Sequence, residues 1–372
     1  MPKKITLIEP FFTGSHQQWA EGLQKNSRYE IEILSLKGRH WKWRMYGGAV
    51  VLAEKFNQLK YRPDLILATD MLDLTTFLAL TREKSGDVPV AIYFHENQIT
   101  YPWSPDDADV ESGRNNQYGF VNYTSALAAD RVFFNSNFHK EEFLNTLPVF
   151  LSQFPDHQGL HHVEGLLNKS KVLHLGMNLK RFDSFKNARP KNNVPVLLWN
   201  HRWEYDKNPD LFFNALFQLK KEPIDFRLIV LGESYQKSPP VFARAKKELK
   251  EQIIHFGYAD SFETYASLIW QTDILPVTSR QDFFGGSVVE GVYCDCEPLL
   301  PNRLAYPEHF SKGIIRTHFY ESENEFYDAL KKRIQLFNCE NKFNGRQFVE
   351  KYDWEELIGK YDREFDRLIS AG

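Results

Sequence analysis

The segment from Ser279 to Glu290, SRQDFFGGSVVE, combines residue types that can bind a phosphorylated sugar. The apolar TDILPVTS before it predicts a buried strand, and SVVEGVY is typical of the first turns of a buried helix. Glycines at such a helix start let unpaired amides approach a diphosphate. Glu290, eight residues after Asp282 and expected on roughly the same face, can accept hydrogen bonds from ribose hydroxyls. The segment predicts a nucleotide-sugar pocket; an acid and two glycines that merely cap a helix are the alternative.

A second segment, WNHRWEYDKNP, carries two cations in a predicted loop. It follows the apolar strand VPVLLW and precedes the helix-like DLFFNALFQLK, so Arg202 and Lys207 lie where α/β folds hold their ligand residues. A guanidinium binds a pyrophosphate bidentately, and an ammonium acts on it as a point charge. The alternative is an ordinary solvated charge pair.

Polar residues also follow two predicted strands near the N-terminus. EPFFTGSHQQW places Gly14, Ser15 and His16 in the loop after the first strand, with a helix expected to begin near Gln17. HENQITYP, which begins at His95, follows the strand VPVAIYF. Both loops are therefore expected at the ligand-binding edge of a sheet, although a His-Glu pair at a strand end can be purely structural.

Length and patterning predict two domains of α/β class. The chain has 372 residues, more than one compact domain usually holds. Alternation of strands with helix-length stretches such as 17–25 and 48–60 implies parallel sheets with helices on both faces. A polar, Pro-containing stretch at 184–195 marks the expected break. The expected strands are KKITLIEPFF, YEIEILSL, DLILATD, VPVAIYFHE and DRVFFNS in the first half, and VPVLLW, FRLIVLGE, IIHFGY, ILPVTS and GIIRT in the second.

The C-terminal stretch FVEKYDWEELIGKYDREFDRLI predicts an amphipathic helix. Its apolar and aromatic residues recur at helical spacing: Phe348, Tyr352, Leu357, Tyr361, Phe365 and Leu368.

Charge and cysteine content narrow the function classes. The net charge of −3 gives no global attraction to nucleic acid, so a polyanionic partner must meet a local basic patch. Cys294, Cys296 and Cys339 form neither a disulfide framework nor a zinc quartet, which favours a reducing compartment. With no apolar leader and no 18-residue apolar segment, we expect a soluble, cytoplasmic protein without a membrane partner.

The segment from Asp282 to Glu290 resembles the Glu-x7-Glu signature of retaining glycosyltransferases of the GT-B fold, in the large glycosyltransferase 4 family, with Asp in place of the first Glu. The resemblance implies that Arg202 and Lys207 bind the donor diphosphate, that His95 lies beside the transferred sugar, and that Gly14 and Ser15 form the first loop. It also implies two Rossmann-like domains facing across a cleft: 1–186 for the acceptor, 187–347 for the nucleotide sugar, and a helix at 348–372 that crosses back to the N-terminal domain.

A narrower resemblance rests on a set of motifs: EPFFTGSH, GRHWKWR, FHENQITYP, NQYGFVNYTSALAADRVFFNSNFH and FPDH, followed by NHRWEYDKNP and DFFGGSVVE. Together they resemble the tRNA-queuosine α-mannosyltransferases. The resemblance implies transfer of mannose from GDP-mannose to queuosine in the anticodon loop of a tRNA, without a metal ion or other cofactor.

The predicted site residues fall into three groups. The catalytic residues are His95, Asp282, Arg202 and Lys207; the donor-binding residues are Gly14, Ser15, Arg202, Lys207, Asp282, Phe283, Phe284, Gly285, Gly286, Ser287 and Glu290; the acceptor-binding residues are His16, Trp41, Lys42, Trp43, Arg44, Glu96 and Asn97. The basic and aromatic segment Trp41–Arg44 suits phosphates and splayed bases of an RNA loop. Both tryptophans could equally pack in a core.

The resemblance implies retention of configuration, and since no carboxylate is an obvious nucleophile, we expect front-side attack. His95 would orient the sugar, and Glu290 would hold the ribose. Three alternatives stay open: a GT-B transferase for a lipid or small glycoside, a sugar-nucleotide epimerase or phosphorylase, and a noncatalytic RNA-binding protein with an inherited nucleotide pocket, which Asp282 favours.

Overall fold

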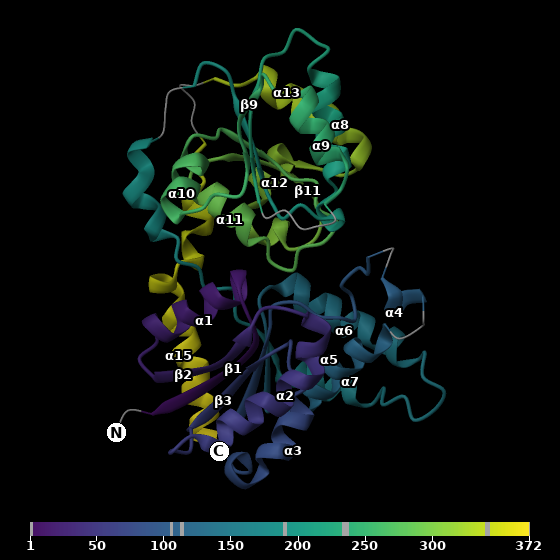
Figure 1. Cartoon of the computed structure of the whole chain (residues 1–372), viewed down its shortest axis with the longest axis vertical. Helices are drawn as coiled ribbons and strands as arrows, with labels where there is room; N and C mark the ends of the chain where they lie inside the picture. Colours follow the sequence, from purple (N-terminus) through teal and green to yellow (C-terminus); the bar gives the residue numbers. More distant parts are fainter. Residues whose placement is uncertain are drawn as a thin grey trace. The chain divides into compact units, whose positions relative to one another are not determined.

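A computed structural model describes residues 3–104, 107–111, 115–188, 192–232, 238–338 and 343–371. The chain forms two compact units (Figure 1). Unit 1 consists of Met1–Asn178 and Trp354–Gly372, and unit 2 is Leu179–Asp353.

The core of unit 1 is a six-stranded parallel sheet in the order β2-β1-β3-β4-β5-β6. The fully buried strands β3 and β4 are continuous apolar runs, as expected where both faces of a parallel sheet are covered. The strands are β1 Lys4–Phe12, β2 Glu30–Lys37, β3 Leu65–Thr69, β4 Val90–Phe94, β5 Arg131–Phe134 and β6 Ser170–Val172.

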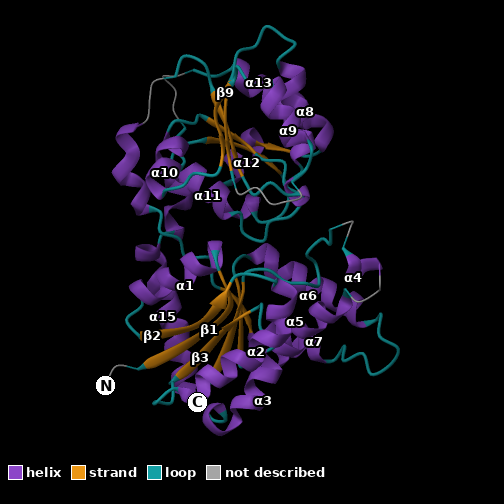
Figure 2. Cartoon of the chain, viewed as in Figure 1, coloured by secondary structure: helices purple, strands orange, loops and turns teal. Residues whose placement is uncertain are grey.

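Helices cover both faces of this sheet. Figure 2 shows α1 and α15 on one side and α2, α3 and α5 on the other. The helices of unit 1 are α1 Gly14–Asn26, α2 Trp41–Gln58, α3 Leu74–Ser85, α4 Ala108–Glu111, α5 Asn116–Ala128, α6 Asn137–Leu151, α7 His162–Lys169 and α15 Trp354–Ala371. The last helix buries the apolar face predicted from its periodicity, including Leu357, Tyr361 and Phe365.

Unit 2 is built on a second six-stranded parallel sheet, in the order β12-β11-β10-β7-β8-β9. Its strands are β7 Val196–Asn200, β8 Arg227–Leu231, β9 Ile253–Gly257, β10 Ile274–Pro276, β11 Glu297–Pro301 and β12 Phe319–Tyr320. Its helices are η1 Lys180–Ala188, η2 Tyr205–Lys207, α8 Pro209–Leu219, α9 Val241–Glu248, α10 Phe262–Trp270, α11 Gly286–Tyr293, η3 Tyr306–His309, α12 Lys312–His318, α13 Glu323–Gln335, α14 Arg346–Val349 and η4 Glu350–Tyr352.

Side-chain contacts explain why unit 2 begins at Leu179 rather than at the predicted residue 187. The backbone carbonyl of Phe182 accepts a hydrogen bond of 2.8 Å from the Trp270 indole, and its ring packs on Phe262. At the other boundary the carboxylate of Asp353 accepts the amide hydrogen of Leu179 at 2.8 Å. The long helix α15 starts at Trp354, later than the predicted 348.

Two local predictions for unit 2 were wrong. GIIRT, expected as a strand, lies within the helix α12, where Ile314 and Ile315 are only half-buried. The strand β11 was missed because prolines stand at its second and last positions, Pro298 and Pro301, and proline is rare inside sheets.

Each sheet has a point at which the strand order reverses direction. In unit 1 it lies between β1 and β3, and in unit 2 it lies between β7 and β10. Ligands of open parallel sheets bind outside the carboxyl ends of the strands at such points. We therefore expect functional residues in the segments that follow β1, β3, β7 and β10.

Candidate active site

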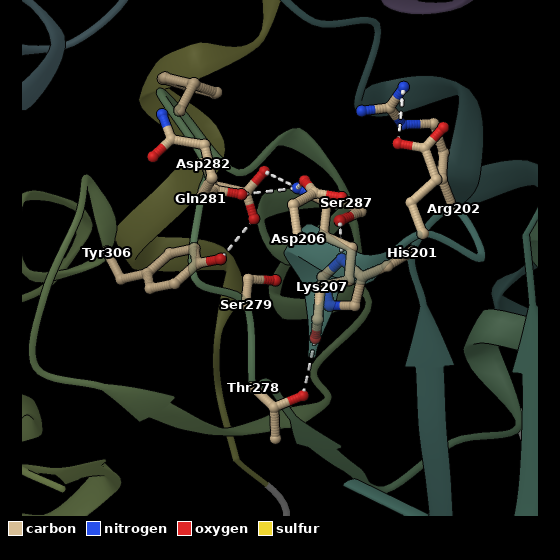
Figure 3. Close-up of polar contacts among 12 residues, drawn as sticks. His201, Arg202, Asp206, Lys207, Thr278, Ser279, Gln281, Asp282, Ser287 and Tyr306 are labelled. Atoms are coloured by element: carbon tan, nitrogen blue, oxygen red, sulfur yellow. Dashed lines mark hydrogen bonds and ion pairs between the residues drawn. The ribbon is translucent and has the colours of Figure 1, made fainter. Parts of the chain in front are cut away.

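The loops that follow β7 and β10 are joined by hydrogen bonds to the main chain (Figure 3). The Thr278 hydroxyl donates to the carbonyl oxygens of Lys207 and Asn208, at 2.9 and 3.0 Å. The amide of Arg280 donates to the carbonyl of Asp206 at 2.8 Å. The two segments singled out from the sequence thus form one site at the carboxyl edge of the sheet.

Lys207 is a buried cation at the centre of this site. Its Nζ donates to the carbonyl oxygen of Gln281 at 2.6 Å and to Oδ1 of Asp282 at 3.1 Å, and it lies 2.9 Å from Oδ2 of Asp206. Burial alone would lower the pKa of Lys207, but Asp282 and Asp206 outweigh it and raise the pKa. The ammonium therefore stays charged, as a diphosphate site requires.

Asp282 is tied to Lys207 and to Tyr306, whose hydroxyl donates to Oδ2 of Asp282. Burial opposes ionisation, but Lys207 and the nearby His201 hold the pKa of Asp282 below its usual value. Asp282 lies in the loop before α11, which begins at Gly286. The prediction that it shares a helical face with Glu290 was therefore wrong, because the helix starts only at Gly286.

The start of α11 is shaped by Gly285. This residue has φ of 82°, in the left-handed region, and a Cβ there would lie 2.8 Å from the ring of Tyr306. The first amides to bond back into the helix are those of Val288 and Val289, so the amides of Gly286 and Ser287 precede its hydrogen-bond ladder. These two amides lie at the helix terminus that the sequence predicts to bind an anion.

His201 supports the same helix start and was not found from the sequence. Its Nδ1 lies 3.1 Å from the Ser287 hydroxyl, while Nε2 is buried and has no hydrogen-bond partner within the described part of the chain. Burial, with Lys207 adding to it, lowers the pKa of His201 to about 4 despite the two nearby aspartates. The imidazole is neutral, and one ring nitrogen remains for a ligand.

Glu290 belongs to a different cluster from Asp282. Oε2 of Glu290 accepts the Tyr265 hydroxyl at 2.5 Å, and Oε1 lies 3.6 Å from Arg181, whose guanidinium stacks on Phe262 at 3.8 Å. Burial raises the pKa of Glu290, although Tyr265 and Arg181 oppose the rise. The carboxyl group is thus held in one orientation on α11.

The remaining predicted donor residues are placed differently. Arg202 is exposed, and its guanidinium lies 3.4 Å from Glu204, on the side of Lys207 away from Tyr306 (Figure 3). Phe283 and Phe284 are buried, with the ring of Phe284 packed against His309 and Tyr352. The two phenylalanines can serve a ligand only through their backbone.

In unit 1 the predicted glycine loop is the first turn of a helix. α1 begins at Gly14, three residues earlier than expected, and Gly14 adopts φ of 52° with open space around it. Ser15 is exposed in the same turn. The positive φ that glycine allows is what turns β1 directly into α1.

The side chains of His16 and His95 lie next to each other, beside the buried carboxylate of Glu9. Nδ1 of His16 lies 3.2 Å from Oε2 of Glu9, a fully buried residue in β1, and the rings of His16 and His95 are 4.1 Å apart. Burial would lower the pKa of His16, but Glu9, aided by Asp70 and Glu96, raises it to about 9. His16 is therefore an imidazolium at neutral pH.

His95 is neutral beside it. Burial and the neighbouring His16 and His139 hold the pKa of His95 well below its usual value, and its buried Nε2 has no hydrogen-bond partner in the ranges that the structure describes. Its backbone amide donates to Oδ1 of Asp70 at 2.8 Å. Burial raises the pKa of Asp70 to about 8, although the His16 imidazolium opposes the shift.

Among the described residues, one group has the donor types of a metal site. Ligand atoms of Glu9, His16 and His95 all lie within 4.8 Å of one another. Two imidazoles and a carboxylate suit a divalent transition metal. Because this group could hold a metal ion, the expectation that sugar transfer needs no metal remains a prediction.

The two other predicted acceptor residues of this loop have local roles. Asn97 is fully buried: its Oδ1 accepts the amides of Ile99 and Thr100, and its Nδ2 donates to the Thr100 hydroxyl. Glu96 is half-buried and accepts from Gln98 at 3.0 Å. The side chain of Asn97 is thus used in shaping the loop.

The basic and aromatic segment Trp41–Arg44 forms the first turn of α2. Nζ of Lys42 lies between the carboxylates of Asp107 and Asp109 and over the rings of Trp41 and Trp103. Its charge is already neutralised, and Trp41 is partly buried. Trp43 is 64% exposed and is the residue of this segment most open to a base.

Arg44 donates to the carbonyl oxygen of Lys37 at 3.1 Å. Cys294 and Cys296 are buried free thiols, and Cys339 lies outside the described residues. No helix in the described ranges is both long and apolar enough to cross a membrane.

Comparison with solved structures defines the class of the fold. The chain matches HepE of Anabaena in complex with UDP with a TM-score of 0.65 at 15% identity, over 98% of this chain and 100% of that one. It matches sucrose-phosphate synthase of Thermosynechococcus elongatus with a TM-score of 0.68 at 13% identity, over 100% of both chains. Residues 180–347 match the family model of glycosyl transferases group 1. The protein is a glycosyltransferase of the GT-B fold.

The N-terminal half makes the family more specific. Residues 4–177 match the model described as tRNA-queuosine alpha-mannosyltransferase N-terminal. The chain is 32% identical over 382 aligned residues to the tRNA-queuosine alpha-mannosyltransferase of Drosophila melanogaster, covering 98% of this chain and 97% of that protein. It belongs to the tRNA-queuosine alpha-mannosyltransferase family. A second relative, the GDP-mannose:cellobiosyl-diphosphopolyprenol alpha-mannosyltransferase of Xanthomonas oryzae pv. oryzae (strain PXO99A), is 23% identical over 53% of both proteins.

Proposed function

We propose that this protein transfers mannose from GDP-mannose to queuosine in the anticodon loop of a tRNA. The observation that carries the acceptor is the full-length similarity to the Drosophila protein, which includes the N-terminal half that carries the family-specific model. The names of both curated relatives support mannose as the sugar, and the name of the Xanthomonas protein supports GDP as the nucleotide.

The donor diphosphate would bind between Lys207 and the start of α11. Lys207 supplies a buried positive charge, and the amides of Gly286 and Ser287 supply hydrogen bonds from a helix N-terminus. Arg202 is exposed and can swing from Glu204 to the diphosphate. Together these groups would stabilise the charge on the departing GDP without a metal ion.

Glu290 would hold the ribose, since Tyr265 and Arg181 fix its carboxyl group. His95 would contact the transferred sugar with Nε2, which has no hydrogen-bond partner among the described residues. Because His95 is neutral, it can donate a hydrogen bond without repelling an oxocarbenium-like sugar. His16, held as an imidazolium by Glu9, keeps the charge of this cluster balanced.

The chemical step would be a front-side displacement. The bond between the anomeric carbon and the β-phosphate oxygen breaks, and the bond to an acceptor hydroxyl forms on the same face of the sugar. The departing phosphate oxygen takes the proton of that hydroxyl, so configuration is retained and every atom is accounted for.

The donor and the absence of a metal requirement are tested together. Purified protein is incubated with queuosine-containing tRNA and GDP-mannose, UDP-glucose or UDP-galactose, with and without EDTA, and release of the nucleoside diphosphate is measured. We expect tRNA-dependent release of GDP that EDTA does not reduce. Release of UDP would overturn the donor, and loss of activity in EDTA, restored by a metal, would assign a metal to the reaction.

The name of the Xanthomonas relative favours a second candidate acceptor, a lipid-linked diphosphate sugar. That match covers only 53% of the chain. Release of GDP that depends on such a lipid and not on tRNA would support it.

A further inference from the structure

Unit 1 contains a groove of about 370 Å³ away from the residues discussed above. One wall is the end of the edge strand β6 and the residues after it, Val172, Leu173 and His174. The other wall is the C-terminal helix α15, through Lys360, Arg363, Glu364 and Arg367. No large aromatic ring lines the groove, so its chemistry is that of cations beside a sheet edge.

The acidic residues Asp362 and Asp366 of α15 lie on a different face of the helix from its basic residues. Asp362 accepts hydrogen bonds from the Ser27 hydroxyl and the Arg28 amide, and Asp366 pairs with Arg28. Those acids point toward the loop between α1 and β2, where Asp362 is hydrogen-bonded and Asp366 is paired with a cation. Lys360, Arg363 and Arg367 recur at helical spacing on the opposite face, over the groove.

The groove keeps an excess of positive charge. Glu364, the one carboxylate among the described lining residues, is already paired with Arg367 and with Lys171, the latter at 2.9 Å. Lys360 and Arg363 are exposed and make no hydrogen bond or ion pair within the described ranges. Three cations and one carboxylate therefore line the groove, in a chain whose net charge is −3.

The groove is also structurally connected to the cluster around His95. The Tyr361 hydroxyl of α15 donates to the carbonyl of His174 at 2.8 Å and accepts from the Trp19 indole at 3.0 Å. The ring of Trp19 in turn lies 4.8 Å from that of His95. Both sites thus lie at the carboxyl ends of strands of the same sheet, separated by a buried aromatic layer.

We propose that this groove binds the sugar-phosphate backbone of the tRNA substrate, outside the reacting nucleoside. The inference rests on the proposed function, which supplies a polyanionic acceptor. Unpaired lysine and arginine side chains neutralise phosphates, whereas base recognition uses stacking surfaces that the groove lacks. The groove is the local basic patch that a chain of net negative charge needs to hold RNA.

The test is the double variant Lys360→Gln/Arg363→Gln of the full chain. Both side chains are exposed, so folding is retained. The matched control is Lys247→Gln/Lys250→Gln, which removes two exposed cations of unit 2 that make no ion pair with any described residue. Binding of fluorescent queuosine-containing tRNA is followed by anisotropy at several salt concentrations, beside binding of GDP and binding to phosphatidylserine/phosphatidylcholine vesicles.

We expect the groove variant to bind tRNA at least tenfold more weakly, with the log-log salt slope lowered by about two, one for each phosphate that is no longer neutralised. Its GDP affinity and thermal midpoint should match wild type, and the control should bind tRNA normally. Unchanged tRNA affinity and salt slope in the groove variant, or a reduction confined to the vesicles, would overturn the groove assignment and leave the proposed function intact. A wild type without any tRNA binding would overturn both.

Discussion

At the scale of single residues, the central feature is a lysine buried between two carboxylates. Lys207 would carry the positive charge that stabilises the departing diphosphate. Replacement by methionine should lower kcat at least 100-fold, about the cost of removing one electrostatic group from a transition state. It should also destabilise unit 2 by about 3 kcal/mol or more, because Asp206 and Asp282 are left buried without a partner.

The double variant Lys207→Met/Asp282→Asn separates the two effects. It removes one stranded carboxylate, so the thermal midpoint should recover partly while activity stays low. Steady-state kinetics and calorimetry on both variants provide the measurement. Near-normal turnover in the double variant would show that Lys207 serves stability alone.

The His16 imidazolium predicts a pH dependence of stability. The pKa of His16 is about 9 in the folded chain, against 6.5 for an unperturbed histidine. Its contribution to the free energy of unfolding is therefore complete below pH 6.5 and is lost as the pH rises through 9. The loss is about 3 kcal/mol at most. Because the pKa of Asp70 is raised to about 8, Asp70 also makes the stability fall as the pH rises from about 4 to 8. The other titratable groups next to His16 and Asp70 are Glu9, Glu96 and the neutral His95.

The check is the thermal midpoint between pH 6.5 and 9 for wild type and His16→Gln. We expect a falling midpoint in wild type and a flatter profile in the variant. His161→Gln, which alters an exposed histidine in the same unit, should keep the wild-type slope. A slope that survives in His16→Gln would exclude the Glu9–His16 pair as its source.

The loops that hold the functional residues could be predicted from the sequence. The side chains that these residues contact could not. Lys207, Asp282 and Glu290 lie at strand ends or at a helix start as predicted, because the apolar runs around them are long and distinct. Tyr306, Tyr265 and Glu9 come from distant or apolar stretches and reach the site only through tertiary packing. Neutralisation of Lys42 by Asp107 and Asp109 likewise depends on contacts across more than sixty residues.

At the scale of elements, the donor site depends on how α11 begins. Gly285→Ala forces a side chain into φ of 82° and places its Cβ 2.8 Å from Tyr306. We expect a decrease of about 1–3 kcal/mol in stability and at least tenfold weaker GDP binding, because the helix start must shift. Gly313→Ala in α12 meets no atom within 4 Å and should change neither the stability nor the GDP affinity, both measured by calorimetry. Equal GDP affinity in both variants would contradict a role for this helix start.

The elements themselves were largely predictable where the chain is apolar. Buried parallel strands appear as short apolar runs, and these runs predict nine of the twelve strands from the sequence alone. The exceptions have physical reasons: β11 contains prolines, β6 and β12 are very short, and GIIRT is too brief to distinguish strand from helix by period.

At the scale of the whole molecule, unit 1 is completed by the last segment of the chain. Trp354 at the start of α15 fills the space above Gly22 and Gly176, and Tyr361 bonds to Trp19. A protein truncated after Asp353 should therefore lose the cooperative unfolding of unit 1, while unit 2 keeps its own core and its GDP affinity. Calorimetry combined with limited proteolysis distinguishes the units. Two unchanged transitions in the truncated protein would contradict this dependence.

The assignment as a whole is tested most directly by the product on the RNA. tRNA with and without queuosine is incubated with wild type or Lys207→Met and GDP-mannose, then digested to nucleosides for mass spectrometry. We predict that the queuosine peak gains the mass of one hexose only with wild type and only in tRNA that contains queuosine. A hexose on tRNA that lacks queuosine, or no adduct despite measurable binding of GDP-mannose, would contradict the assignment.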